Sequence, residues 1–234
     1  MTFGIIGSGA FGTALSISLS SINKKLILWT RNQDIVNSVH EIRENRLRLP
    51  GYTLPQNIIV TNDINQMGNC SIILIAVPMQ QLRSVVELHR SSLEGKILVA
   101  CCKGFEVSTG LGPTSILEMA SNKTAVLTGP SFAADLASGF PTALTVASKV
   151  EGLAQFIQSE LGTETLRLYW SDDPIGAEFG GALKNVIAIG CGVTIGAGYG
   201  SSSRAALMTR GYSEIISIAP YFGAKPETLS GLSG

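Results

Sequence analysis

Lys184 is the residue whose sequence neighbourhood most suggests proton-transfer chemistry. It stands in a helical pattern, and most of the positions three, four or seven residues away carry small side chains: Ala177, Gly180, Gly181, Ala188 and Cys191. Glu178 lies six residues away and should point in another direction. An amine that is desolvated on such a face has a lowered pKa and can exchange a proton near neutral pH. The same pattern also fits a helix-packing stripe from which Lys184 extends into solvent.

A glycine motif near the N-terminus suggests that the chain binds a dinucleotide. The motif is a G-x-G-x-x-G between an expected strand and an expected helix, made of Gly7, Ser8, Gly9, Ala10, Phe11 and Gly12. In that context Gly7 permits the tight turn, Gly9 lets a pyrophosphate approach the backbone, and Gly12 lets the helix pack on the strand. The N–H groups that begin the helix then face the phosphates. The alternative is a tight turn that binds nothing.

The end of the second expected strand bears on the choice between NAD and NADP. Sheets that bind NAD usually carry Asp or Glu there, about 20 residues after the glycines, to hold the ribose 2′-OH. This chain has Arg31 and no acid at that point. A guanidinium pairs with a phosphate through two parallel hydrogen bonds, so the sequence favours NADP without excluding NAD. An ordinary surface arginine is the alternative.

Two further segments follow expected strands and so belong at the carboxyl edge of the sheet, where open parallel sheets bind ligands. Lys103 comes just after the strand that ends near Cys101, and this places it for an anion unless it is a solvated loop lysine. Gly129 and Ser131 follow a later strand and precede a short helix that contains Ala133. Ser131 should either cap that helix or hold a phosphate together with the adjacent N–H groups.

The cysteines and histidines suggest no further site. The sequence has no C-x-x-C pair and no His near any of its four cysteines, which are Cys70, Cys101, Cys102 and Cys191. We therefore expect reduced thiols and no metal. His40 and His89 stand in polar helical stretches and are expected at the surface, outside any site. This argues against a His-based dehydrogenase and against a Ser-His hydrolase.

Composition limits the class of protein. The 234 residues can form a real core and suffice for one large domain with part of a second. Lys plus Arg number 17, as do Asp plus Glu, so no basic excess is available for binding nucleic acid. The longest uncharged stretch, residues 185–203, contains five glycines and is expected to form a buried helix and no membrane span. The N-terminus lacks the pattern of a signal peptide, so a cytoplasmic location is expected.

The elements that must position these residues alternate between strands and helices. Short apolar runs predict strands at residues 3–6, 26–29, 58–60, 71–77, 97–101, 125–128, 142–147 and 165–169. Helical patterns separate many of these runs, which predicts βαβ units with right-handed crossovers. The expected fold is α/β, with a Rossmann-like doubly wound sheet that is largely parallel.

The pattern changes after the last expected strand. Only helices are expected there, at about residues 175–197 and 202–219, with Asp172 or Asp173 as N-cap and Pro174 in the first turn. The sequence therefore predicts a dinucleotide-binding domain at residues 1–171. A partial all-α domain on the substrate side should follow at residues 172–234.

Six motifs in the same order resemble those of the bacterial-type NAD(P)-dependent glycerol-3-phosphate dehydrogenases. They are G-x-G-x-F-G, L-W-T-R-N, A-V-P, C-K-G-F-E, G-P-S-F-A and G-G-A-L-K-N-V-I-A-I. The resemblance implies hydride transfer between NADPH, or NADH, and dihydroxyacetone phosphate, which gives sn-glycerol 3-phosphate for phospholipid synthesis. It implies that Lys184 donates or accepts the proton at the carbinol oxygen and contacts substrate. It also implies that Lys103 contacts substrate and cofactor, and that Gly129 and Ser131 line the substrate site. The cofactor contacts it implies, besides the glycine motif, are Arg31 and Ala133.

The chain departs from the family pattern in two ways. The family's chains continue beyond Gly234 with a Gly-Asp motif and a Ser-Arg-Asn segment that contacts substrate phosphate and cofactor. In addition, residues 200–203 read Gly-Ser-Ser-Ser where the family usually has Gly-Asp-Asn, and Ile195 replaces a usual Asp. These departures keep open a truncated dinucleotide-binding protein with little or no turnover. A related reductase of another small keto acid is a third hypothesis, disfavoured by the last two motifs. Helices at residues 172–234 should leave apolar faces that a second copy covers, as a homodimer, or that stay mobile.

Overall fold

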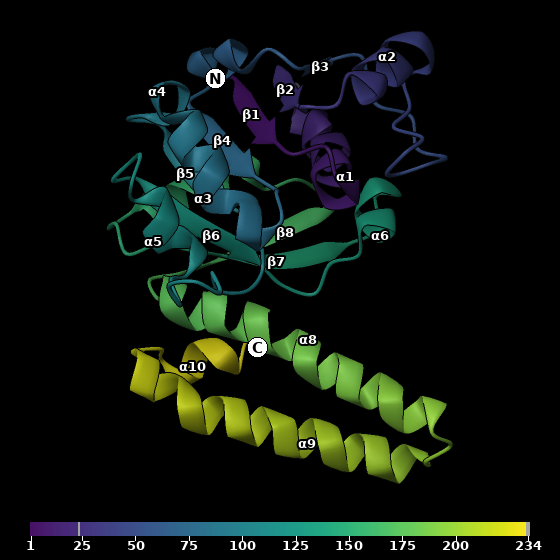
Figure 1. The fold of residues 1–234 in the computed structure, drawn as a ribbon, viewed down its shortest axis with the longest axis vertical. Helices are drawn as coiled ribbons and strands as arrows, with labels where there is room; N and C mark the ends of the chain where they lie inside the picture. Colours follow the sequence, from purple (N-terminus) through teal and green to yellow (C-terminus); the bar gives the residue numbers. More distant parts are fainter. Residues whose placement is uncertain (23, 233–234) are drawn as a thin grey trace.

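The fold is built on one sheet. The computed structural model describes residues 1–22 and 24–232. Within these residues the strands lie in the order β3-β2-β1-β4-β5-β6-β7-β8. They are β1 (Phe3–Ile6), β2 (Leu26–Trp29), β3 (Ile58–Thr61), β4 (Ile72–Ile75), β5 (Ile97–Ala100), β6 (Thr124–Thr128), β7 (Thr142–Ala147) and β8 (Leu166–Ser171). Neighbouring strands are parallel except for β6 and β7, so the predicted doubly wound, largely parallel sheet is confirmed (Figure 1).

Helices connect most of the strands and follow the last one. In chain order the helices are α1 (Ala10–Leu19), α2 (Gln33–Ile42), α3 (Met79–Leu88), α4 (Arg90–Leu93), α5 (Pro113–Leu117), α6 (Ala133–Ala137), α7 (Leu153–Leu161), α8 (Pro174–Gly196), α9 (Ser201–Ile218) and α10 (Pro226–Leu229). Short 3₁₀ turns are η1 (Ser20–Ile22), η2 (Ile64–Asn69) and η3 (Ala219–Phe222).

Helices cover both faces of the sheet, and apolar side chains fill the space between them and the strands. One core cluster joins the sheet to α1, α2, α6 and α7, and a second joins its other face to α3, α4, α5 and the start of α8. All four residues of β4 are buried, because a central parallel strand is covered on both sides. This explains why the strands read as continuous apolar runs in the sequence. The parallel pairing of neighbouring strands also aligns the carboxyl ends of β1, β2, β4, β5 and β6 along one edge.

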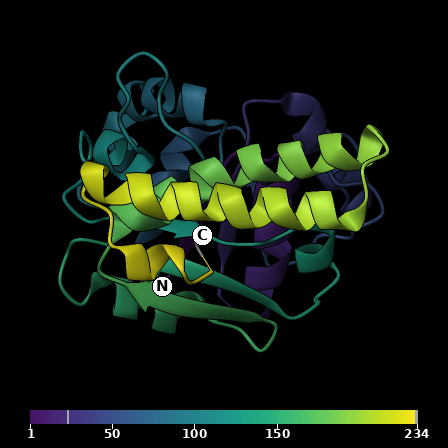
Figure 2. The ribbon, with the colours of Figure 1, turned by 90° about the horizontal axis from the view of Figure 1, so that it is seen from below.

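The last strand gives way directly to a pair of long helices. Of the two predicted N-cap residues, Asp173 is the one that caps α8: its side chain accepts the N–H of Gly176 at 2.9 Å. Pro174 occupies the first turn of the helix, as expected. Figure 2 shows α8 and α9 lying side by side across the end of the sheet unit. The Lys184 helix is therefore held between the sheet and α9.

The second half of α8 is more exposed than the sequence suggested. The helix was expected to be buried beyond residue 185, but Val186, Ile189 and Val193 are 61%, 69% and 64% exposed. That expectation is wrong because α9 packs along only one side of α8. By length and apolar composition α8 could cross a membrane, and 22% of its most apolar 18-residue stretch is buried inside the protein. Its first two turns, however, are enclosed and pack against α10.

Candidate active site

The glycine motif forms the tight turn between β1 and α1. Gly7 has a φ of +110°, which L side chains rarely adopt, and a Cβ there would collide with the carbonyl group of Ala76. A Cβ on Gly12 would overlap the carbonyl oxygen of Gly7, so α1 reaches its position on β1 only with glycine there. At Gly9, by contrast, the space around a Cβ is open to 4 Å among the described atoms outside the turn. That open space is what the approach of a pyrophosphate requires.

Hydrogen bonds fix this turn and leave the start of α1 facing outward. The Ser8 hydroxyl donates to Thr30 Oγ1 at 2.7 Å, and the Ser8 carbonyl accepts from Asn45 Nδ2 at 2.9 Å. Gly9 is the N-cap of α1, and because it has no side chain it cannot cap the first N–H groups itself. The positive end of the helix dipole and these donors together favour an anion.

A cavity of about 770 Å³ opens beside the turn. Gly7, Ser8 and Gly9 line one part of it, and Arg31, beyond the end of β2, lines another. The segment after β4, residues 76–78, lines the remaining side of the cavity near the turn. Three neighbouring parallel strands therefore end at one cavity, as in dinucleotide-binding sheets.

The charged groups of this cavity are basic. Among the described residues that line it there are two arginines, Arg31 and Arg48, and no carboxylate. The sequence reasoning missed Arg48, which lies in the loop after α2. Its only signal was the Arg46-Leu47-Arg48 run, which resembles an ordinary solvated loop. Two guanidinium groups at one cavity can hold a phosphate more firmly than one.

His89 was expected at the surface of a helix and outside any site, and that expectation is wrong. It is the C-cap of α3, is half-buried, and lines the same cavity. Its ring lies edge-on to Trp29, with the centroids 5.1 Å apart, and burial lowers the pKa of His89. The physical reason is that α3 packs on the same face of the sheet as the Trp29 side chain, which brings its C-cap to the end of β2. His40 is exposed, as expected.

Lys184 carries a desolvated amine, as its small neighbours predicted. Its Nζ is buried and has no hydrogen-bond partner among the described residues, so the alternative in which it extends into solvent is wrong. Burial, and secondarily the positive charge of Lys103, lower the pKa of Lys184 to about 8. Glu178 does point elsewhere: its Oε1 accepts the backbone N–H of Thr114 at 2.7 Å.

The end of β6 supplies a second buried polar atom without a partner. Thr128 Oγ1 is buried and unbonded among the described residues, and a Cβ on Gly181 would stand 2.6 Å from it. Glycine at position 181 therefore lets α8 cross close to the end of β6, and Lys184 follows one turn later on the same side. Two unsatisfied buried polar atoms at one place are unusual in a folded protein and suit a polar ligand.

Lys103 and Gly129 lie at this same place. Lys103 Nζ is within 3.5 Å of the carbonyl oxygen of Gly129, and partial desolvation lowers the pKa of Lys103. Gly129 has a φ of +150°, and a Cβ on it would stand 2.8 Å from a methyl group of Leu144. The loops after β5 and β6 thus bring together the residues that the sequence singled out separately.

The helix after β6 starts differently from the prediction. Ser131 was one candidate for its N-cap, but the N-cap of α6 is Phe132, so that assignment is wrong. Phe132 takes the extended conformation of a cap residue, and Ser131 precedes it, half-buried. Ala133 begins α6, which packs on α1, and lies with Ala10 and Phe11 at the rim of one core cluster.

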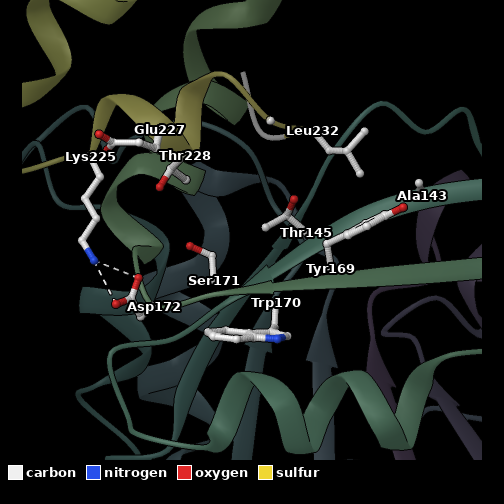
Figure 3. Close-up of a pocket in the computed structure, with 11 residues that line it drawn as sticks. Ala143, Thr145, Tyr169, Trp170, Ser171, Asp172, Lys225, Glu227, Thr228 and Leu232 are labelled. Carbon is white, nitrogen blue, oxygen red and sulfur yellow. Dashed lines mark hydrogen bonds and ion pairs between the residues drawn. The ribbon is translucent and has the colours of Figure 1, made fainter.

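A second cavity, of about 570 Å³, lies away from these residues, between β7, β8 and α10 (Figure 3). Thr145, Trp170 and Leu232 line it, and the Lys225 amine pairs with the Asp172 carboxylate at its side, at 2.9 Å. It contains none of the site residues expected from the sequence. In the described part of the chain, no three His, Cys, Asp or Glu side chains gather as metal ligands, and the cysteines are buried and free.

Two family models match the chain. Residues 2–154 match the N-terminal part, and residues 173–234 the C-terminal part, of the NAD-dependent glycerol-3-phosphate dehydrogenases. The chain belongs to this family. The resemblance drawn from the six motifs is therefore confirmed, as are the enzyme class and the NAD(P) cofactor, and the hypothesis of a reductase for a small keto acid is wrong.

Relatives and solved structures agree with this assignment. The glycerol-3-phosphate dehydrogenase (NAD(P)+) of Ruegeria sp. (strain TM1040) is 52% identical over 236 residues, covering 100% of this chain and 73% of that protein. The crystal structure of glycerol-3-phosphate dehydrogenase from Coxiella burnetii has a TM-score of 0.93 at 31% identity, over 100% of this chain and 73% of that chain. A ketopantoate reductase from Ralstonia eutropha JMP134 has a TM-score of 0.66 at 13% identity, covering 96% and 76%, and shares the fold alone.

Proposed function

We propose that this family member transfers a hydride between NAD(P)H and dihydroxyacetone phosphate, forming sn-glycerol 3-phosphate, and that Lys184 moves the accompanying proton. The observation that carries this is the buried Lys184 Nζ, without a hydrogen-bond partner among the described residues. It lies near a second cation, Lys103, where the loops after two parallel strands converge. A buried amine without a carboxylate counter-ion is suited to an oxyanion that forms during the reaction.

The residues around the glycine motif fit the dinucleotide. The first turn of α1 would receive the pyrophosphate at Gly9, with Ser8, Ala10, Phe11 and Ala133 forming the surface around it. Arg31 and Arg48 would pair with a ribose 2′-phosphate, which favours NADPH over NADH. The nicotinamide end would then extend along the strand ends toward Lys103. When bound, the reduced nicotinamide supplies the hydride.

Lys184 would act at the carbonyl oxygen of the substrate. In the direction of reduction the hydride forms the new C–H bond at the carbonyl carbon, and the C=O π pair becomes an alkoxide. The Lys184 ammonium stabilises that negative charge and gives its proton to the oxygen, leaving a neutral amine. In the direction of oxidation the neutral amine takes the hydroxyl proton. A lowered pKa allows Lys184 to serve in both directions.

The substrate itself would be held by Lys103, Gly129 and Ser131 together with Lys184. We assign residues 1–171 as the dinucleotide-binding unit and residues 172–234 as part of the substrate-side unit. The exposed apolar side chains of α8 and α9 would suit coverage by a second copy in a homodimer. A cytoplasmic location fits this metabolic reaction.

A second candidate function is dinucleotide binding with little or no turnover by residues 1–234 alone. The observation that favours it is the exposed apolar surface of α8, where Ile189 is 69% and Val193 64% exposed beyond the Lys184 turn. Covering each such side chain would contribute about 1.5–3 kcal/mol, so an uncovered α8 is free to loosen at the site.

A steady-state assay of the purified 234-residue chain with dihydroxyacetone phosphate and NADPH separates the two functions. Turnover of about 1 per second or faster supports the dehydrogenase. Tight NADPH binding by nicotinamide fluorescence with no detectable turnover supports the second function. Absence of both NADPH and NADH binding would contradict both proposals.

A further inference from the structure

The loop that carries Lys103 is tied to α3 by a two-point ion pair. Arg83 on α3 donates from Nε and Nη2 to the two carboxylate oxygens of Glu106, at 2.8 and 2.7 Å. The Glu106 side chain is only 8% exposed, and it also accepts a hydrogen bond from the Thr109 hydroxyl. A bidentate pair of this kind restricts orientation as well as distance. It therefore fixes the middle of the loop, three residues beyond Lys103.

A second side chain of α3 holds the backbone on both sides of Glu106. Gln80 donates from Nε2 to the carbonyl oxygen of Phe105 at 2.9 Å, and its Oε1 accepts the N–H of Val107 at 3.0 Å. The three consecutive residues 105–107 are thus bonded to one helix through either backbone or side chain. This arrangement leaves the loop little freedom to move away from α3.

The other side of the loop packs on the helix that carries Lys184. The Phe105 ring lies edge-on to Phe179 of α8, with the centroids 5.8 Å apart, and both belong to the core between α8 and α9. Residues 105 and 179 are two and five residues from Lys103 and Lys184, respectively. The loop therefore links α3 to α8 at the point where the two amines approach each other.

Two ammonium groups at close range repel, and a lysine has a long flexible side chain that would otherwise turn into solvent. We propose that Arg83 and Glu106, assisted by Gln80, are positioning residues that hold the Lys103 backbone so that its amine stays beside Lys184. This deepens the proposed function, because the paired amines are its substrate site. Neither Arg83 nor Glu106 touches the reacting atoms in this assignment.

The proposal has a signature that a merely structural ion pair lacks. Lys103 is the charged group that depresses the basicity of Lys184 among the described residues. If the loop loosens, that repulsion weakens and the Lys184 amine becomes more basic. The acylation rate of Lys184 then rises with pH over a higher range, and the midpoint of this pH profile does not depend on how accessible the amine is. Loss of stability alone would leave the reactivity of a folded chain unchanged.

The experiment is competitive acetylation of the folded chain with acetic anhydride, between about pH 6 and 10, followed by peptide mass spectrometry. The variants are Glu106→Gln and Gln80→Ala; the second removes two hydrogen bonds from an exposed side chain and should fold even if the first does not. The matched control is Glu160→Gln, which breaks a 2.7 Å ion pair with Lys24 on another part of the molecule.

We expect the midpoint of the acetylation pH profile of Lys184 to move to higher pH in Glu106→Gln, so that the neutral fraction at pH 7 falls about threefold or more; the midpoint should move less in Gln80→Ala and not at all in Glu160→Gln. A Lys184 midpoint that is equal or lower in every folded variant than in the unaltered chain would overturn the proposal. Acetylation needs no turnover and no cofactor. A chain that proves inactive as a dehydrogenase would contradict the proposed function and still allow this test.

Discussion

Glu178 and Lys184 stand six residues apart on α8, yet the carboxylate of the first does not neutralise the amine of the second. Glu178 is directed to the start of α5, where it accepts the Thr114 N–H at 2.7 Å. Lys184 is directed to the end of β6, where it has no hydrogen-bond partner among the described residues. One helix thus holds an acid and a base that are both desolvated and kept apart, which moves both of their pKa values toward neutrality.

Replacing Lys184 should separate function from stability. Lys184→Met should lower turnover by about 10²–10⁴-fold, because the proton donor is lost, while NADPH affinity stays nearly unchanged. The same change should stabilise the fold by about 1 kcal/mol, because an unpartnered buried amine is removed. Steady-state rates, fluorescence titration and urea unfolding measure the three effects. Lys123→Met, at an exposed position just before β6, is the control. A loss of only a few-fold in rate would show that Lys184 is not the proton donor.

The pH dependence should reverse with the direction of reaction. The pKa of Lys184, at about 8, lies below its ordinary value because of burial and the charge of Lys103. Reduction needs the ammonium, so its rate should fall as pH rises through about 8. Oxidation needs the neutral amine, so its rate should rise over the same range. Measuring the rate as a function of pH in both directions checks this. If both rates rise, or both fall, as pH increases through about 8, Lys184 is not the group that titrates.

Glu178 should make the fold less stable as pH rises. Burial raises the pKa of Glu178 from 4.5 to about 7, so between these values the folded chain binds more protons than the unfolded chain. The free energy of unfolding must therefore decrease across that window, by at most about 3 kcal/mol. Glu178→Gln keeps an acceptor for Thr114 and removes the titration.

The variant Glu178→Gln should accordingly be more stable than the unaltered chain at pH 8 and similar to it near pH 4.5. Urea unfolding at the two pH values measures the difference. Glu94→Gln, an exposed position, is the control. A Gln variant that is less stable at pH 8 would mean that the ionised carboxylate is required by the fold.

Much of this arrangement was predictable because it depends on local patterns. The strands could be located because buried parallel strands are continuous apolar runs, and the glycine motif because a turn and a close helix contact require Gly7 and Gly12. The desolvated state of Lys184 followed from the small residues on its helix face. The N-cap of α8 could be narrowed to Asp172 or Asp173, because a cap residue precedes a proline in the first turn of a helix.

What the sequence did not predict depends on contacts between distant segments. His89 and Arg48 reach the cavity beside the glycine turn because α3 and the loop after α2 return to the ends of neighbouring strands, which no local pattern records. The exposure of Ile189 depends on how much of α8 is covered by α9. The Arg83–Glu106 pair joins residues 23 positions apart, and neither stands in a recognisable motif with the other.

The two arginines of the cavity should set the cofactor preference. Arg31→Glu should reverse it toward NADH, because a carboxylate repels the 2′-phosphate and can accept from a 2′-OH. Arg48→Ala should weaken NADPH binding about tenfold and leave NADH binding unchanged. Arg46→Ala is the matched control, since Arg46 lies in the same run but does not line the cavity. Dissociation constants from nicotinamide fluorescence measure these preferences. Equal constants for NADPH and NADH in the unaltered chain would show that the two arginines do not set a cofactor preference.

Two glycines of one motif should respond in opposite ways to the same substitution. Gly9 has an extended backbone and open space where a methyl group would stand, so Gly9→Ala should change the free energy of unfolding by less than about 0.5 kcal/mol. The methyl group would, however, occupy the approach of the pyrophosphate, and NADPH affinity should fall about tenfold or more. Gly12→Ala should instead destabilise the fold by about 2 kcal/mol or more, because its Cβ overlaps the carbonyl oxygen of Gly7. Urea unfolding and fluorescence titration of both variants test the pair. Tight NADPH binding by a stable Gly9→Ala chain would show that the dinucleotide does not approach this turn.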